Sequence, residues 1–77
     1  MTSVQNIILK AVEKFNIRFE RVTPAGDDAV VFYIGGIKIA IRYYSELDTY
    51  QVIRRGVAGV FNSTGIAGVA LAQYLTP

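Results

Sequence analysis

The stretch that decides the fold is AVVFYIGGIKIAIRYY, residues 29–44. Two runs of β-branched and aromatic side chains, 29–34 and 37–44, are joined by Gly35-Gly36. A two-residue Gly-Gly loop predicts a hairpin, because tight hairpin turns need a positive φ that glycine adopts without steric cost. The loop length also predicts the cross-strand pairs, which are Ile34 with Ile37, Phe32 with Ile39, and Val30 with Ile41.

A third strand is expected before this hairpin, over residues 17–23, and residues 24–27 are interpreted as a four-residue loop. This loop would place Thr23 opposite Asp28, and Phe19 opposite Phe32. One face of the sheet then collects Ile17, Phe19, Val30, Phe32, Ile34, Ile37, Ile39, Ile41 and Tyr43. The other face collects Arg18, Glu20, Val22, Ala29, Val31, Tyr33, Lys38, Ala40 and Arg42. Arg21 is the exception, since this register puts it on the apolar face.

Helices are expected on either side of these strands. Residues 3–15 carry an apolar stripe at helical spacing, with Thr2 or Ser3 as N-cap and Gln5 on the polar side. Apolar side chains at spacings of three and four predict a second helix over 46–60, although a fourth strand over 49–54 is the competing interpretation. A last helix is expected to run from residue 65 or 66 to 75, capped by Ser63 or Thr64.

These patterns predict one small α+β domain over residues 1–77. Its expected order is a helix, a three-stranded antiparallel meander and one or two C-terminal helices, α-β-β-β-α-α. That order resembles double-stranded RNA-binding domains, although residues 63–73 hold no charge where that family carries lysines. It also resembles restriction-endonuclease-like cores. Asp27 would match their first carboxylate, but Ala40-Ile41-Arg42 stands where Glu-x-Lys is needed, so the resemblance implies no cleavage.

Composition narrows the chemistry. The chain has no Cys and no His, which excludes disulfide scaffolds and removes the two commonest soft metal ligands. General acid–base and nucleophilic catalysis lose their usual residues for the same reason. We therefore expect no enzyme, no catalytic residue, no metal and no cofactor. A cytoplasmic protein is expected, because residues 1–14 lack the features of a signal peptide. No membrane span is expected, because polar residues and glycines interrupt the charge-free stretch over residues 56–77.

The charge distribution suggests self-association. Charged residues make up 18% of the chain, against roughly 25% in average domains, and none follows Arg55. A core this small needs support from disulfides, metal or oligomerisation, and only the last is available. We therefore predict a self-associating interaction module, most simply a homodimer. The expected interface residues are Val57, Gly59, Val60, Phe61, Ile66, Gly68, Val69 and Leu71.

The basic residues support an alternative function. Cations beside aromatic rings on a sheet face form a suitable surface for bases and phosphates. A nucleic-acid-binding protein is therefore the alternative, using Arg18, Tyr33, Lys38, Arg42, Tyr44, Arg54 and Arg55. A heterologous protein partner would also fit an exposed apolar patch, and a viral or mobile-element accessory protein would fit a chain of this kind.

Overall fold

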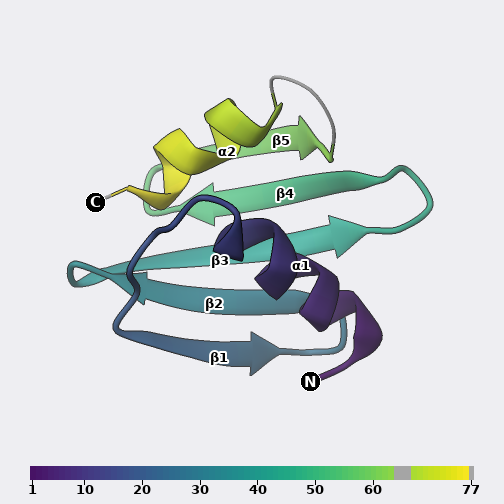
Figure 1. Cartoon of the computed structure of the whole chain (residues 1–77), viewed down its shortest axis with the longest axis horizontal. Coiled ribbons are helices and arrows are strands. Elements are labelled where there is room, and N and C mark those ends of the chain that lie inside the picture. Colours follow the sequence, from purple (N-terminus) through teal and green to yellow (C-terminus); the bar gives the residue numbers. More distant parts are fainter. Residues whose placement is uncertain (64–66, 77) are drawn as a thin grey trace.

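The computed structural model describes residues 1–63 and 67–76, and for Ala67 the backbone alone. Its elements in chain order are α1 (Ser3–Glu13), β1 (Arg21–Ala25), β2 (Ala29–Ile34), β3 (Ile37–Tyr44), β4 (Thr49–Arg54), β5 (Val57–Asn62) and α2 (Ala67–Leu75). The strands form an antiparallel sheet in the order β1-β2-β3-β4-β5, and α1 and α2 pack on one face of it (Figure 1). The α+β class is confirmed, but the expected three-strand order is wrong. The five-strand meander also departs from the α-β-β-β-α order of double-stranded RNA-binding domains.

The first helix begins where the sequence predicts. The Thr2 hydroxyl accepts a hydrogen bond from the Gln5 backbone N–H, and the Gln5 side chain accepts one from the Thr2 backbone N–H. This capping box satisfies two donors that a helix start leaves free. Gln5 was expected on the polar side, but it is buried. Its amide nitrogen donates to the carbonyls of Gly26 and Ala29, at 2.9 and 3.0 Å, and so joins α1 to the turn between β1 and β2.

The central hairpin has the predicted register. Ile34 pairs with Ile37, Phe32 with Ile39, and Val30 with Ile41. Gly35 and Gly36 both adopt a positive φ, as the tight turn requires. The core forms on the face covered by α1 and α2, where Phe32 and Ile39 are fully buried against Ile8 and Leu75.

The first strand is shifted by three residues from its predicted register. Val22, not Phe19, pairs with Phe32, and Ala25 pairs with Ala29. The turn is shorter than expected because Gly26 adopts φ +61 and reverses the chain, which leaves Pro24 in the strand. An odd shift exchanges the two faces of a strand. Val22 therefore packs on the core, and Arg21, the expected exception, lies on the opposite face.

The helix expected over 46–60 is wrong, and the competing strand over 49–54 is confirmed as β4. A further strand, β5, follows a two-residue loop, with Arg54 paired to Val57. Gly56 in this loop has φ +78, a conformation that ends a helix and suits a tight turn. The helical spacing was coincidental, since four of the residues that carry it are exposed: Leu47, Ile53, Val57 and Val60. Residues 45–48 have the S-x-x-D pattern that is typical of a helix start, but they cap no helix. They lie in the β3–β4 turn, where Asp48 adopts φ +49.

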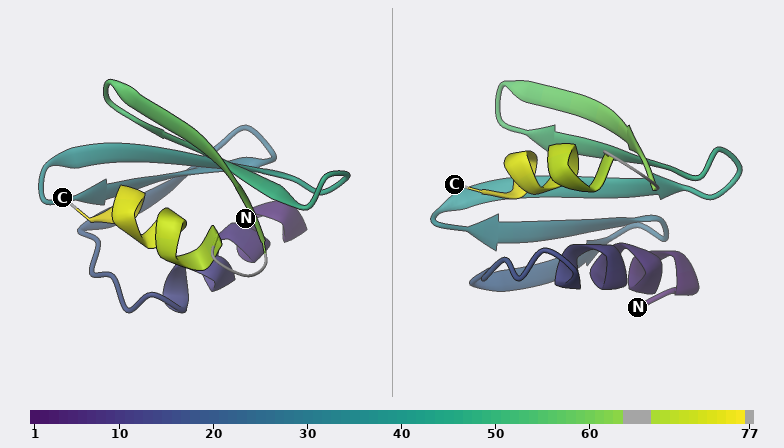
Figure 2. Two further views of the ribbon diagram at one scale, coloured as in Figure 1. Left: turned by 90° about the horizontal axis from the view of Figure 1, so that it is seen from above. Right: turned by 45° about the horizontal axis from the view of Figure 1, so that its top comes forward.

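The last helix, α2, packs on β4 and β5 and buries Leu71 and Leu75. Its predicted capping residue Thr64 and the predicted start at 65 or 66 lie outside the described residues. The alternative cap, Ser63, uses its hydroxyl to donate to the Asp48 carboxylate in the β3–β4 turn. Figure 2 shows both helices below the sheet when it is viewed along its edge, while the opposite face is covered by no part of the chain that the structure describes.

Candidate functional site

The uncovered side of the sheet, called here the outer face, is the first candidate. It is formed by the side chains that alternate with the core residues along each strand. By register these are Arg21, Thr23, Ala25, Ala29, Val31, Tyr33, Lys38, Ala40, Arg42, Tyr44, Thr49, Gln51, Ile53, Ala58, Val60 and Asn62. Among these described positions there are three cations and no carboxylate. The outer face is therefore cationic, with an apolar centre formed by Val31, Ala40 and Ile53.

The corrected register of β1 accounts for much of this charge. Arg21 stands opposite Tyr33 and places its guanidinium carbon 4.2 Å from the centroid of the Tyr33 ring, a cation–π contact. Glu20, which was expected on this face, instead uses its carboxylate to accept a hydrogen bond of 3.2 Å from the Gly36 backbone N–H. The shift thus brings a cation onto the outer face and removes a carboxylate from it.

A shallow hollow of about 340 Å³ opens on the outer face between β3 and β4. Ala40 and Ile53 form its floor, and Lys38 and Arg55 stand at its rim. Ile53 is 48% exposed there, although it is a large aliphatic residue in the interior of a strand. Arg54 of β4 pairs with Ile39 of β3, and the two strands are antiparallel. The next residue along the chain, Arg55, therefore comes beside Lys38, the residue before Ile39. The hollow therefore combines an apolar surface with two exposed cations.

Arg42 is less available than these cations. Its Nε lies 3.3 Å from a carboxylate oxygen of Asp28, and each side chain is about half exposed (48% and 47%). Nearby, the Tyr44 hydroxyl donates a hydrogen bond of 3.1 Å to the Gln51 side chain. Arg42 and Tyr44 lie on the outer face as predicted, but each already has a partner within the chain.

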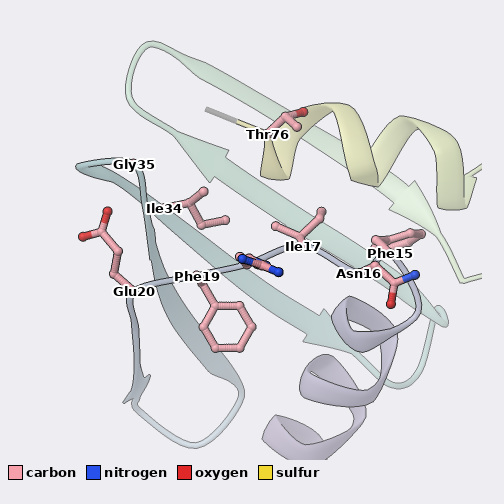
Figure 3. A pocket seen from close by; sticks show the side chains of 9 residues that line it. Phe15, Asn16, Ile17, Phe19, Glu20, Ile34, Gly35 and Thr76 are labelled. Atoms are coloured by element: carbon pink, nitrogen blue, oxygen red, sulfur yellow. The ribbon is translucent and has the colours of Figure 1, made fainter.

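Two predicted nucleic-acid-binding residues do not lie on the outer face. Arg54 is on the helix side of β4, where its guanidinium donates to the Thr76 carbonyl. Arg18 belongs to the segment that crosses from α1 to β1 and lines a pocket of about 550 Å³. Figure 3 shows this pocket between the crossover and the end of α2, with Ile17 and Ile34 beside it and the Glu20 carboxylate on the side of Gly35. Arg21 was not among the predicted site residues, because the predicted register placed it on the apolar face.

The edge strand β5, with the helix packed on it, is the second candidate, because it holds most of the predicted interface residues. Val57, Val60 and Val69 are exposed, at 50%, 66% and 64%. Phe61 instead packs edge-on against Tyr74 of α2, with ring centroids 5.0 Å apart, and Leu71 is buried. Gly59 faces the same two rings, and Gly68 faces Phe15. Ile66 lies outside the described residues.

A network at one end of the sheet carries the clearest electrostatic effects. The Asp48 carboxylate accepts hydrogen bonds from the Tyr43 hydroxyl, at 2.6 Å, and from the Ser63 hydroxyl. The bonds from Ser63 and Tyr43 lower the pKa of Asp48, and the bond to Asp48 raises the pKa of Tyr43 to about 12. The Ser63 N–H also donates to the Asp48 carbonyl. This network joins the β3–β4 turn to the end of β5.

Within the described residues, no three carboxylates lie close enough together to hold a metal ion. Asp27 and Asp28 lie in the β1–β2 turn, where the Asp27 carbonyl accepts a hydrogen bond from the Thr2 hydroxyl. None of the helices in the described ranges is long and apolar enough to cross a membrane. Comparisons with protein-family models, curated proteins and solved structures found no match.

Proposed function

We propose that the chain is a small non-enzymatic interaction module that self-associates by pairing β5 with β5 of a second copy. The observation that carries this proposal is the composition of β5, VAGVFN, which is the last strand of the sheet order. It contains no charged residue and no proline. An open edge strand presents unpaired N–H and C=O groups, which form a template for another strand.

The strand at the opposite edge of the sheet, β1, supports this proposal, because it has features that oppose strand pairing and β5 lacks them. Strand β1 carries an exposed Arg21 and an exposed Pro24. Charge and proline are the features by which natural edge strands avoid pairing, because proline lacks the N–H that a ladder needs. The sheet therefore has one protected edge and one unprotected edge, and we expect association at the unprotected one.

A second copy of the chain fits this edge well. Antiparallel pairing of two β5 strands about a two-fold axis makes a self-complementary interface and extends the five strands to ten. No charge opposes a like charge across the seam, since β5 has none. The exposed Val57 and Val60, on opposite sides of the strand, would be partly covered by the copy. Such burial supplies the support that a core of this size needs.

Sedimentation equilibrium between about 1 and 200 µM tests the proposal. We expect a mass of twice 8.5 kDa for the wild-type chain at the upper concentrations. Val60→Lys places a charge on an exposed position of the edge, so it should give a folded monomer. Ile7→Lys is the matched control, because Ile7 is an exposed aliphatic residue of α1, the helix packed on β2 and β3.

Three results would decide the matter. A dimer that is lost in Val60→Lys and retained in Ile7→Lys supports pairing through β5. A wild-type monomer at 200 µM overturns the proposal, as does a Val60→Lys variant that remains dimeric. Far-UV circular dichroism of each variant confirms that the fold is retained, so that a change in mass reports on the edge alone.

A further inference from the structure

The outer face carries a second inference, which stands whether or not the chain dimerises. Arg21, Tyr33 and Lys38 occupy one row across β1, β2 and β3, and Arg55 continues that row beyond Lys38. Neighbouring strands are about 4.8 Å apart, so the three cations span about 14 Å across the sheet. All three cationic side chains are exposed. The row is therefore an accessible line of positive charge.

Two carboxylates close to the first three strands have partners within the chain. Asp28 is paired with Arg42, and the Glu20 carboxylate accepts from the Gly36 backbone N–H. No strand residue on this face, within the described part of the chain, is acidic. A face with three cations and no strand carboxylate complements an anion. A second copy of this face would add like charges and no strand carboxylate, so it fits less well.

The shape of the outer face indicates which kind of anion it would bind. Between Lys38 and Arg55 the hollow has an apolar floor, formed by Ala40 and the half-exposed Ile53. A flat apolar surface flanked by cations suits a ligand that is itself a flat ring linked to phosphates. The Tyr33 ring, with Arg21 stacked on it, provides a second flat surface in the same row. Bases that are free to unstack, as in single strands, can use both surfaces.

We propose that the outer face binds single-stranded nucleic acid. A base lies on the floor of the hollow, against Ile53, and the adjoining phosphates contact Lys38 and Arg55. Arg21 contacts a further phosphate, and the next base stacks beside the Arg21–Tyr33 pair. The phosphate contacts supply affinity without sequence preference, and the apolar floor selects an unpaired base.

Fluorescence anisotropy with labelled 12-nucleotide oligo(dT) and oligo(U) tests this proposal. Three phosphate contacts on a single strand predict that Kd rises about 20-fold between 50 and 200 mM salt. Lys38→Ala/Arg55→Ala leaves one contact, so the same change in salt should raise Kd only about 3-fold, and binding at 50 mM should weaken about tenfold or more. Ile53→Asp should also abolish binding, because it places a carboxylate on the floor of the hollow.

Lys10→Ala/Lys14→Ala is the matched control. Both lysines are exposed on the helix side, and the double change lowers the net charge from +2 to zero, as the test variant does. This control should keep the wild-type affinity and salt dependence. Equal losses in the two double variants would overturn the proposal, because they would show a response to net charge alone. The absence of binding at 50 mM salt would overturn it too.

Two further arms exclude other anions. A 12-base-pair duplex should bind at least tenfold more weakly than the single strand, because its bases are not free to lie on Ile53. Equal affinity for the duplex contradicts the proposal. So does binding to phosphatidylserine vesicles that the single strand fails to displace, since an anionic membrane would then be the ligand.

Discussion

Gln5 is predicted to be the polar side chain whose loss most destabilises the fold. It is 2% exposed and makes three hydrogen bonds with its side-chain amide, to the backbone of Thr2, Gly26 and Ala29. Each such bond contributes about 0.5–1.5 kcal/mol net, and a buried carbonyl left without a donor costs about 1–3 kcal/mol. The bond to Ala29 is buried, whereas the other two are partly exposed and water can replace them. We therefore expect Gln5→Leu to lower the free energy of unfolding by about 2–3 kcal/mol.

Thermal and urea denaturation, followed by circular dichroism at equal protein concentration, measure this effect. A loss of that size in a chain of this length lowers Tm by about 10–20 °C. Asn6→Leu is the matched control, because it makes the same amide-to-aliphatic change at the next residue, where the side chain is exposed. The control should stay within about 0.5 kcal/mol of the wild type. A Gln5→Leu variant as stable as the control would refute the role assigned to Gln5.

Further predictions concern the pH dependence of stability and the fit between β5 and α2. The lowered pKa of Asp48 stabilises the fold at pH values above the ordinary pKa of 3.8, and this stability is lost as the pH falls through the lowered pKa. Asp48→Asn should therefore weaken the dependence of stability on pH in the acid range, as measured by urea denaturation at several pH values. The pKa of Tyr43, raised to about 12, stabilises the fold below pH 10, and this stability is lost between pH 10 and 12. Tyr43→Phe should remove this loss of stability in the same urea measurements. A Cβ at Gly59 would lie 2.9 Å from the Phe61 ring and 3.1 Å from the Tyr74 hydroxyl, so Gly59→Ala should cost about 1–3 kcal/mol in urea denaturation. Gly68→Ala should be neutral or stabilise the fold by up to about 1 kcal/mol, because a Cβ there would make ordinary contact at 3.5 Å and alanine favours the helix. A larger loss of stability at Gly68 than at Gly59 would contradict both predictions.

The sequence predicted the central hairpin correctly because one local signal determines it. Gly35-Gly36 specifies both the loop length and the positive φ values, and the loop length specifies every pair across β2 and β3. The register of β1 has no such signal. Pro24 suggested a loop, yet proline is tolerated in an edge strand, where its missing N–H leaves no partner unpaired. The reversal depends instead on Gly26.

The second hairpin was missed for a different reason. Two periods fit residues 47–61, and the helical one counted more apolar residues. The alternation in Tyr50, Gln51, Val52 and Ile53 gave the strand, with Tyr50 and Val52 buried and Ile53 exposed. Gly56, three residues after Ile53, was the available turn signal. In this segment, the position of Gly56 was therefore a better indicator of the turn than the number of apolar residues at helical spacing.

The cations proposed to bind phosphate and the edge proposed to pair with a second copy lie on different parts of the molecule, so the two functions can be tested separately. The cations proposed to contact phosphate lie on the outer face, whereas β5 offers a charge-free edge. Val60→Lys should therefore lose self-association and keep or strengthen oligonucleotide binding, since it adds a cation to the outer face. Lys38→Ala/Arg55→Ala should do the reverse, and remain a dimer while losing affinity for the oligonucleotide. Sedimentation and anisotropy measured on the same two preparations give both readouts. Loss of both properties in either folded variant would show that the two surfaces are one site, built across the dimer, and would contradict their independence.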